Sequence, residues 1–315
     1  MTEILEVLRR VRLALQNGDY PTAITGLEQA VQAARQDGDR AAEGRHLGNL
    51  GLIYHRLGMP DQALACFQDA LDAARAENDR LTEGGLLGNM GNILREIGRC
   101  DEAIDYLNQA LLIAQEVGDV RGRGIWLSNL ALVYDDLSQP DQAIPLHESA
   151  ISVARDLHDQ RGLAIRLGNL GNSYVSKGAY AQAIPLFSEA VPIYRELGDQ
   201  AALAQRLGVI GNLYAEMGRG AQSRRSKLGQ FAQARDYYQQ TLDIARAMGD
   251  QLSVAELLRA LGSIELELGA PDRASAAFET AVQAFVALGR PDQAHEIALL
   301  LENLRNLRGS GDNGL

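Results

Sequence analysis

A five-residue pattern that returns every forty residues constrains this chain more than any other feature. It starts at Leu47 as Leu-Gly-Asn-Leu-Gly, and related versions start at Leu87, Leu127, Leu167 and Leu207. So strict a period is typical of repeat proteins, in which each unit buries its apolar face only by stacking on its neighbours. We therefore expect one array of similar units rather than two conventional domains.

The units are predicted to be pairs of helices. Apolar residues make up 46% of the 315 residues and only 8 are Pro, while the helix-favouring residues Ala, Leu, Gln and Glu are plentiful. In the second unit, Leu47, Leu50 and Tyr54 lie on one helical stripe, and Ala63 and Phe67 begin another. Between the two stripes, a Gly followed by a Pro predicts a helix end and a new helix start.

An Asp marks each unit boundary at the same position. These residues are Asp39, Asp79, Asp119, Asp159, Asp199 and Asp250. Gly precedes four of them, and Asn78 and His158 precede the other two. Gly and Asn favour the left-handed conformation that ends a helix, and Asp is a good N-cap. The boundary dipeptides are therefore predicted to end one helix and cap the next.

The pattern Leu47-x-x-Leu50-Gly51-x-x-Tyr54, followed by Ala63-x-x-x-Phe67-x-x-Ala70, resembles the tetratricopeptide repeat, with Leu in place of the usual Trp. The resemblance extends from about residue 4 to residue 290. The period of forty rather than thirty-four residues is similar to the repeats of the LGN/Pins spindle-orientation adaptors and of many bacterial signalling proteins. The resemblance implies a right-handed α-solenoid whose first helices line a concave groove.

We expect a single all-α domain over residues 1–307, with a flexible tail over 308–315. Its seven repeats are predicted at about 4–38, 39–78, 79–118, 119–158, 159–198, 199–249 and 250–290, followed by a capping helix at 291–307. The sixth repeat contains eleven extra residues, 219–229, which include Arg219, Arg224, Arg225 and Lys227. This segment is predicted to be a mobile surface loop and a possible basic docking point for an acidic partner or phosphate; alternatively it prolongs the helices.

Candidate ligand-binding residues follow from the resemblance, because two positions of the first helix line the groove in this family. Carried onto this chain they are Asn49, Asn89, Asn129 and Asn169, and then Asn92, Asn172 and Asn212. Residues three apart are neighbours on a helix, and an Asn carboxamide can pair with both N–H and C=O of a peptide backbone. The alternative is that these Asn side chains bond within the array.

Specificity is expected from groove positions that differ between repeats. Arg45 and Arg95 are the leading candidates, because the arginines of the N-terminal half could meet carboxylates of a ligand. Acidic residues such as Asp135 and Asp136 recur from the third repeat onward.

Several classes of function are disfavoured. A net charge of -11 argues against a nucleic-acid partner. Without a long apolar run or a signal-peptide pattern at the N-terminus, we expect no membrane partner and a cytoplasmic location. Cys66 and Cys100 are the only cysteines, so neither a disulfide framework nor a multi-cysteine metal site is expected. No catalytic motif or cofactor motif stands out, and we expect neither enzyme activity nor a cofactor.

The leading hypothesis is a non-enzymatic scaffold or adaptor that binds an extended or helical segment of a protein partner in its groove. One alternative is a regulatory module that senses a small molecule or short peptide. Another is a self-assembling scaffold, and a homo-oligomer is therefore possible.

Overall fold

The computed structural model describes residues 2–311 and shows an all-helical chain, without a strand in that range. The helices are α1 (Thr2–Asn17), α2 (Tyr20–Asp37), α3 (Arg40–Arg56), α4 (Pro60–Ala76), α5 (Arg80–Glu96), α6 (Cys100–Val117), α7 (Val120–Asp136), α8 (Pro140–Asp156), α9 (Gln160–Ser176), α10 (Tyr180–Glu196), α11 (Gln200–Arg219), α12 (Arg224–Met248), α13 (Gln251–Glu267), α14 (Pro271–Ala287) and α15 (Pro291–Gly311). The predicted helix pairs and all-α class are confirmed.

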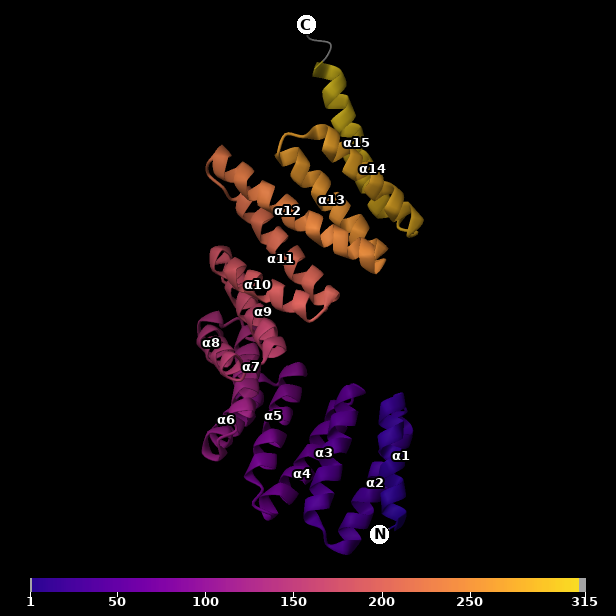
Figure 1. Cartoon of the computed structure of the whole chain (residues 1–315), viewed down its shortest axis with the longest axis vertical. Coiled ribbons are helices and arrows are strands. Elements are labelled where there is room, and N and C mark those ends of the chain that lie inside the picture. The colour runs from indigo at the N-terminus through magenta and orange to yellow at the C-terminus, as the bar shows by residue number, and fades with distance from the viewer. Residues whose placement is uncertain (1, 312–315) are drawn as a thin grey trace. The chain divides into compact units, whose positions relative to one another are not determined.

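The chain forms two compact units, Met1–Asp159 and Gln160–Leu315. In the first unit each helix from α1 to α8 packs on the next, as the series of indigo and magenta helices in Figure 1 shows. In the second unit α9 to α15 pack in the same successive manner. Each unit is a stack of successive helices, as the predicted array requires. That the two units continue as a single array over residues 1–307 stays a prediction.

The boundary residues end and cap helices as predicted. Gly38, Gly118 and Gly249 each have a φ between 71° and 73°, the left-handed region, and Asn78 reaches 55°. The boundary Asp then accepts a hydrogen bond from the backbone N–H three residues later, at 2.8 Å from Asp39 Oδ1 to Ala42 N. The same bond recurs at Asp79, Asp119, Asp199 and Asp250. These caps explain why the dipeptides recur.

Each helix pair is held by one large side chain of the second helix. The seven residues at this position are Leu27, Phe67, Leu107, His147, Phe187, Tyr238 and Phe278, and all are buried. The facing position of the first helix is Gly in five repeats (Gly51, Gly91, Gly171, Gly211 and Gly262), and Val11 and Ala131 occupy it in the other two. A Cβ atom added at Gly171 would lie 2.6 Å from Cζ of Phe187, so these glycines allow the close approach of the two helices.

The expectation of a mobile loop over 219–229 is wrong. Helix α11 continues to Arg219 and α12 already begins at Arg224, so only residues 220–223 connect them. Phe231 is fully buried, and a Cβ atom on Gly218 would lie 2.8 Å from its ring. Because the added turns bury an aromatic side chain, the inserted residues form helix; the alternative of prolonged helices is correct.

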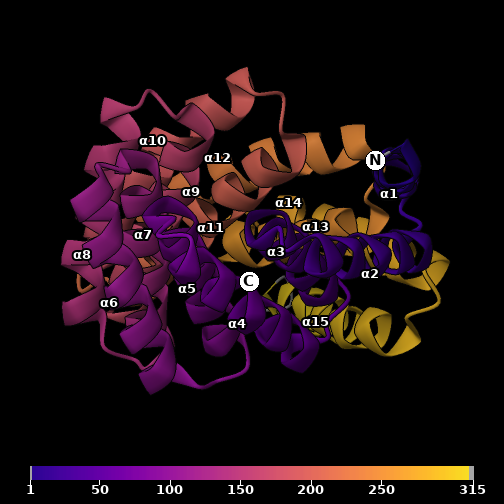
Figure 2. The same cartoon turned by 90° about the horizontal axis from the view of Figure 1, so that it is seen from below.

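The C-terminal helix is also longer than predicted. Helix α15 runs to Gly311 rather than to residue 307, so residues 308–311 belong to the helix and not to a tail. Residues 312–315, the rest of the predicted tail, lie outside the described residues. Figure 2 shows α15 at the yellow end of the chain, and α15 packs on α14.

Candidate functional site

All seven candidate Asn residues lie on first helices of pairs, as the resemblance implied. Asn49 is on α3, Asn89 and Asn92 are on α5, and Asn129 is on α7; Asn169 and Asn172 are on α9, and Asn212 is on α11. Asn49, Asn172 and Asn212 are exposed and the other four are half-buried. Their carboxamides are therefore at surfaces of the first helices and not in the core between the pairs.

Two of these carboxamides are engaged within the protein. Asn92 Nδ2 donates to Glu96 Oε1 at 2.8 Å, one turn along the same helix. The hydroxyl of Tyr238 donates to Asn212 Oδ1 at 2.7 Å. For Asn92 and Asn212 the alternative of bonding within the array is thus correct, although Asn212 keeps its Nδ2 donors.

The predicted specificity residue Arg95 is tied to the next repeat. Its Nη1 lies 2.8 Å from Asp136 Oδ2, and its side chain is 20% exposed. One repeat earlier, His55 Nε2 lies 2.6 Å from Glu96 Oε2. These two pairs join the C-terminal ends of α3, α5 and α7, so polar residues read from the sequence as ligand contacts hold neighbouring repeats together.

Arg45 differs from Arg95, because it is exposed on α3 and no described residue forms an ion pair with it. Its charge acts on the next residue along: burial, and then the positive charge of Arg45, lower the pKa of His46. Arg45 therefore remains available to a ligand carboxylate.

The basic residues of the insertion lie on helices, and two of them have acidic partners. Arg219 pairs with Glu216 one turn earlier. Lys227 Nζ lies 2.8 Å from Glu267 Oε2 on α13 and 5.6 Å from the centre of the Phe231 ring. Arg224 and Arg225 are exposed at the start of α12 and form no ion pair with a described residue. The four basic residues therefore do not lie together on a docking loop: Arg219 is on α11, and Arg224, Arg225 and Lys227 are on α12.

A cavity of about 520 Å³ lies among α11, α12 and α13, and the candidate residue Asn212 is one of the residues that line it. Small residues keep it open: Ala201, Ala204 and Gly208 on α11, and Ala260 on α13. Polar groups surround these apolar walls, including Gln205, Asn212, Tyr238, Thr241, Ser253, Glu256 and Arg259. A pocket with apolar walls and several convergent donors and acceptors is suited to a polar organic ligand such as a segment of peptide.

Sequence reasoning missed Tyr238 and His147, although the sequence carried a signal for both. They are the two polar residues among the seven large side chains that hold the helix pairs, and each bonds to the first helix of its own pair. Tyr238 donates to Asn212, and Nε2 of the fully buried His147 lies 2.9 Å from Asp135 Oδ2. Because a buried polar group needs a hydrogen-bond partner, a polar residue at that position predicts one on the facing helix.

The described residues contain no cluster of three or more His, Cys, Asp or Glu that could hold a metal ion. Among the described helices, none combines the length and apolar character needed to span a bilayer.

The sequence matches models of a known protein family. Models of the tetratricopeptide repeat match residues 3–76, 83–156 and 221–285, and a further one matches 163–197. No curated protein matches the sequence. The matches do not distinguish the LGN/Pins variety of the repeat, so that subtype stays a prediction.

Solved structures share the fold at low sequence identity. The apo form of RapI superposes with a TM-score of 0.63 and 13% identity over 91% of this chain and 99% of that one. Aspartyl phosphate phosphatase F from Bacillus subtilis gives 0.58 and 19% over 87% and 73%. A Rap protein complexed with competence and sporulation factor gives 0.55 and 17% over 98% and 86%.

Proposed function

We propose that this chain, which belongs to the tetratricopeptide repeat family, is a non-enzymatic scaffold that binds a segment of a protein partner on its first-helix surfaces. The cavity among α11, α12 and α13 is the observation that carries the proposal. It is lined mainly by the first helices α11 and α13, as the family's ligand surfaces are, and Asn212 is among the lining residues.

The geometry around Asn212 supports a peptide as the ligand. The Tyr238 hydroxyl holds the carboxamide oxygen at 2.7 Å, which fixes the orientation of the group and leaves the Nδ2 hydrogens to donate to a peptide carbonyl. Arg259 and Glu256, on the facing helix α13, add one charge of each sign at the cavity. A bound segment would thus find a backbone donor at Asn212 and side-chain partners on α13.

Selection of peptides from a random displayed library tests this function, with affinities measured by calorimetry on the purified chain. We expect selected peptides to bind wild type and to lose about tenfold or more in affinity with Asn212→Ala or Arg259→Ala, because each removes a hydrogen bond at a partly desolvated site. Asn108→Ala, which removes an exposed Asn from the second helix α6, is the matched control. Failure to select any peptide, or equal losses with Asn108→Ala, would refute the proposal.

A regulatory module that senses a ligand is the second candidate. The Rap protein complexed with competence and sporulation factor covers 98% of this chain at a TM-score of 0.55, and this likeness in fold favours testing the alternative. A sensor should change conformation when it binds, so a selected peptide should shift the small-angle scattering profile. If the scattering profile is unchanged when the peptide saturates the protein, the sensor function is excluded and the scaffold function stands.

A further inference from the structure

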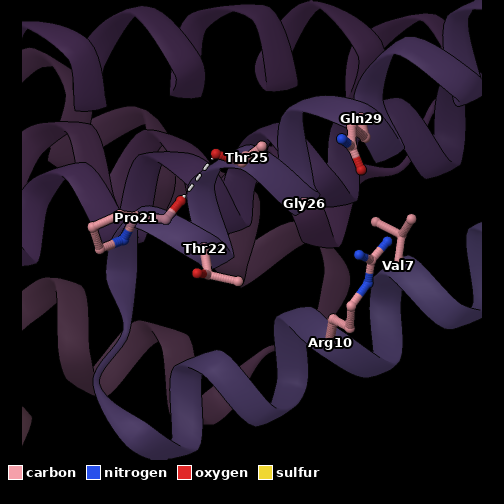
Figure 3. A pocket seen from close by; sticks show the side chains of 7 residues that line it. All are labelled: Val7, Arg10, Pro21, Thr22, Thr25, Gly26 and Gln29. Carbon is pink, nitrogen blue, oxygen red and sulfur yellow. Dashed lines mark hydrogen bonds between the residues drawn. The ribbon is translucent and has the colours of Figure 1, made fainter.

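A pocket of about 300 Å³ opens between α1 and α2, in a part of the first unit that the proposed peptide site does not use. Val7 and Arg10 line it from α1, and Thr22, Thr25, Gly26 and Gln29 line it from α2. Figure 3 shows the side chains of Val7 and Arg10 rising from α1 towards the stretch of α2 that carries Gly26 and Gln29. The volume suits one bulky apolar side chain, with a guanidinium beside it.

Comparison with the following repeats shows which residues differ at this pocket. The space next to Gly26 is taken by Val11, whose Cγ2 would lie 2.5 Å from a Cβ atom there. Forty residues after Arg10 and Gly26 stand Leu50 and Cys66, and the later counterparts are also side chains that fill space: Met90 with Tyr106, and Leu130 with Leu146. Leu50, Met90 and Leu130 are each only 4% exposed. The first repeat thus has an exposed Arg and a Gly where the next three have packed apolar groups.

In the second repeat, the preceding helix α2 covers the matching face. Arg35 on α2 reaches Asp69, the counterpart of Gln29, at 3.6 Å. Glu28 on α2 is near enough to Cys66 that its charge, after burial and Asp69, helps to raise the pKa of the thiol. The face that holds the pocket is therefore one against which a helix packs.

No helix of the first unit covers this face of α1. Leu13 shows the consequence: it is 51% exposed, whereas its counterparts Ile53, Ile93 and Val133 are at most 5% exposed. Around it Arg9, Arg10 and Arg12 are exposed and form no ion pair with a described residue, and among the side chains of α1 that the structure describes Glu6 is the exposed acid beside them. The uncovered face thus carries the exposed Leu13 and, among the side chains that the structure describes, more basic than acidic groups.

Helix α15 presents the complementary surface. Leu299 and Leu300 are 47% and 44% exposed. Glu296 and Glu302 lie one turn before and after Leu299 on the same face, and Asp292 lies one turn further back; all three are exposed. Within the described residues these acids form no ion pair. The exposed face of α15 is thus a leucine pair with an acidic border.

We propose that the α1–α2 pocket of one copy receives helix α15 of a second copy, with Leu299 in the pocket and Glu296 and Glu302 facing Arg9 and Arg10. The match of an apolar anchor with a pocket, and of acidic with basic borders, selects this occupant. The two faces differ and each copy carries both, so the contact is heterologous and association continues head to tail. This self-association is independent of peptide binding at the α11–α12–α13 cavity.

Light scattering on the purified 315-residue chain gives the first test. The mass should rise with concentration above the 34.1 kDa of one copy, and the rise should weaken as salt is added, because exposed charge pairs are screened. A mass that stays at 34.1 kDa up to the limit of solubility would overturn the proposal.

A charge exchange then identifies the faces. Arg9→Glu/Arg10→Glu alone, and Glu296→Arg/Glu302→Arg alone, should each weaken association by about a hundredfold, because like charges then face each other. An equimolar mixture of the two variants should regain it. Loss with the α15 variant but not with the α1 variant, or no recovery on mixing, would overturn the pairing.

The control for altered net charge is Arg224→Glu/Arg225→Glu, which changes two exposed arginines of α12. It should associate like wild type. Circular dichroism melting of each variant shows that it is folded, and recovery in the mixture cannot arise from unfolded chains. Equal loss of association in the control would overturn the assignment to α1.

Discussion

The ring of Phe67 occupies the space that a side chain at Gly51 would need. A Cβ atom on Gly51 would lie 2.7 Å from Cε1 of that ring, and the Phe67 side chain is 1% exposed. The glycine in the repeated pentapeptide is therefore a packing residue, fixed by the aromatic ring sixteen positions later.

Gly51→Ala should destabilise the protein by about 1–3 kcal/mol, because the added methyl forces the buried ring or the helix backbone to move. Gly85→Ala is the control, since Gly85 also lies inside a helix but a Cβ atom there meets nothing within 4 Å. That substitution should stabilise the protein by about 0.5–1 kcal/mol through helix propensity. Denaturant midpoints measure both, and a Gly51→Ala protein as stable as wild type would contradict the packing.

Glu83 should make stability depend on pH. It is 8% exposed and lies 2.8 Å from Nε of Arg75 and 2.5 Å from Nη1 of Arg80. Burial raises its pKa, but the hydrogen bonds from the two arginines outweigh burial, so the pKa is lower than in the unfolded chain. A lowered folded pKa means that the carboxylate stabilises the fold at neutral pH and loses this contribution as the pH falls through the folded value.

Glu83→Gln should therefore cost about 1–3 kcal/mol at neutral pH, and the difference from wild type should shrink as the pH falls below the ordinary glutamate value of 4.5. Glu102→Gln removes a carboxylate that pairs with Arg99 at 2.6 Å on the surface, where both side chains are about half exposed. Exposed pairs contribute little, so this control should melt like wild type. A constant difference between Glu83→Gln and wild type at all pH values would contradict the assignment.

His147 should be coupled to Ala131. The register of the repeats places Ala131 opposite His147, where Gly51 faces Phe67 and Gly171 faces Phe187. His147→Phe alone should destabilise the protein by about 1–3 kcal/mol, because a larger ring meets the methyl of Ala131 and the hydrogen bond to Asp135 is lost. Adding Ala131→Gly should restore the glycine–phenylalanine pair of the other repeats, with a coupling energy of about 1–2 kcal/mol in a double-mutant cycle. Strictly additive effects would show that the two residues do not meet.

The forty-residue period was sufficient to predict the helix pairs, because the same spacing sets both the buried stripes and the capping Asp residues. Asp39, Asp79, Asp119, Asp199 and Asp250 cap helices as expected, since capping depends on residues three apart in sequence. Interactions between residues close in sequence therefore specify the helices and their ends.

The site was harder to predict, because its contacts join residues far apart in sequence. Nothing local in the sequence of α5 indicates that Arg95 reaches Asp136 on α7, and nothing local in the sequence of α11 indicates that Asn212 meets Tyr238 on α12. The family register placed these residues on the correct helix face but did not reveal their partners. A groove residue in sequence is thus a candidate for binding a ligand and equally for joining two repeats.

The helical form of the insertion can be tested by hydrogen exchange. Lys227 N donates to Ser223 O at 2.9 Å, and the Ser223 side chain caps α12 by accepting from Ser226 N at 3.1 Å. Amides from Lys227 to Arg235 should therefore exchange slowly, as those of a packed helix do, while those of the connection at 220–223 exchange fast. Phe231→Ala should speed exchange in this stretch and cost about 3–5 kcal/mol, because the fully buried ring holds α12 against Gly218. Fast exchange throughout 219–229 in wild type would instead support the mobile loop that an insertion in a surface turn favours.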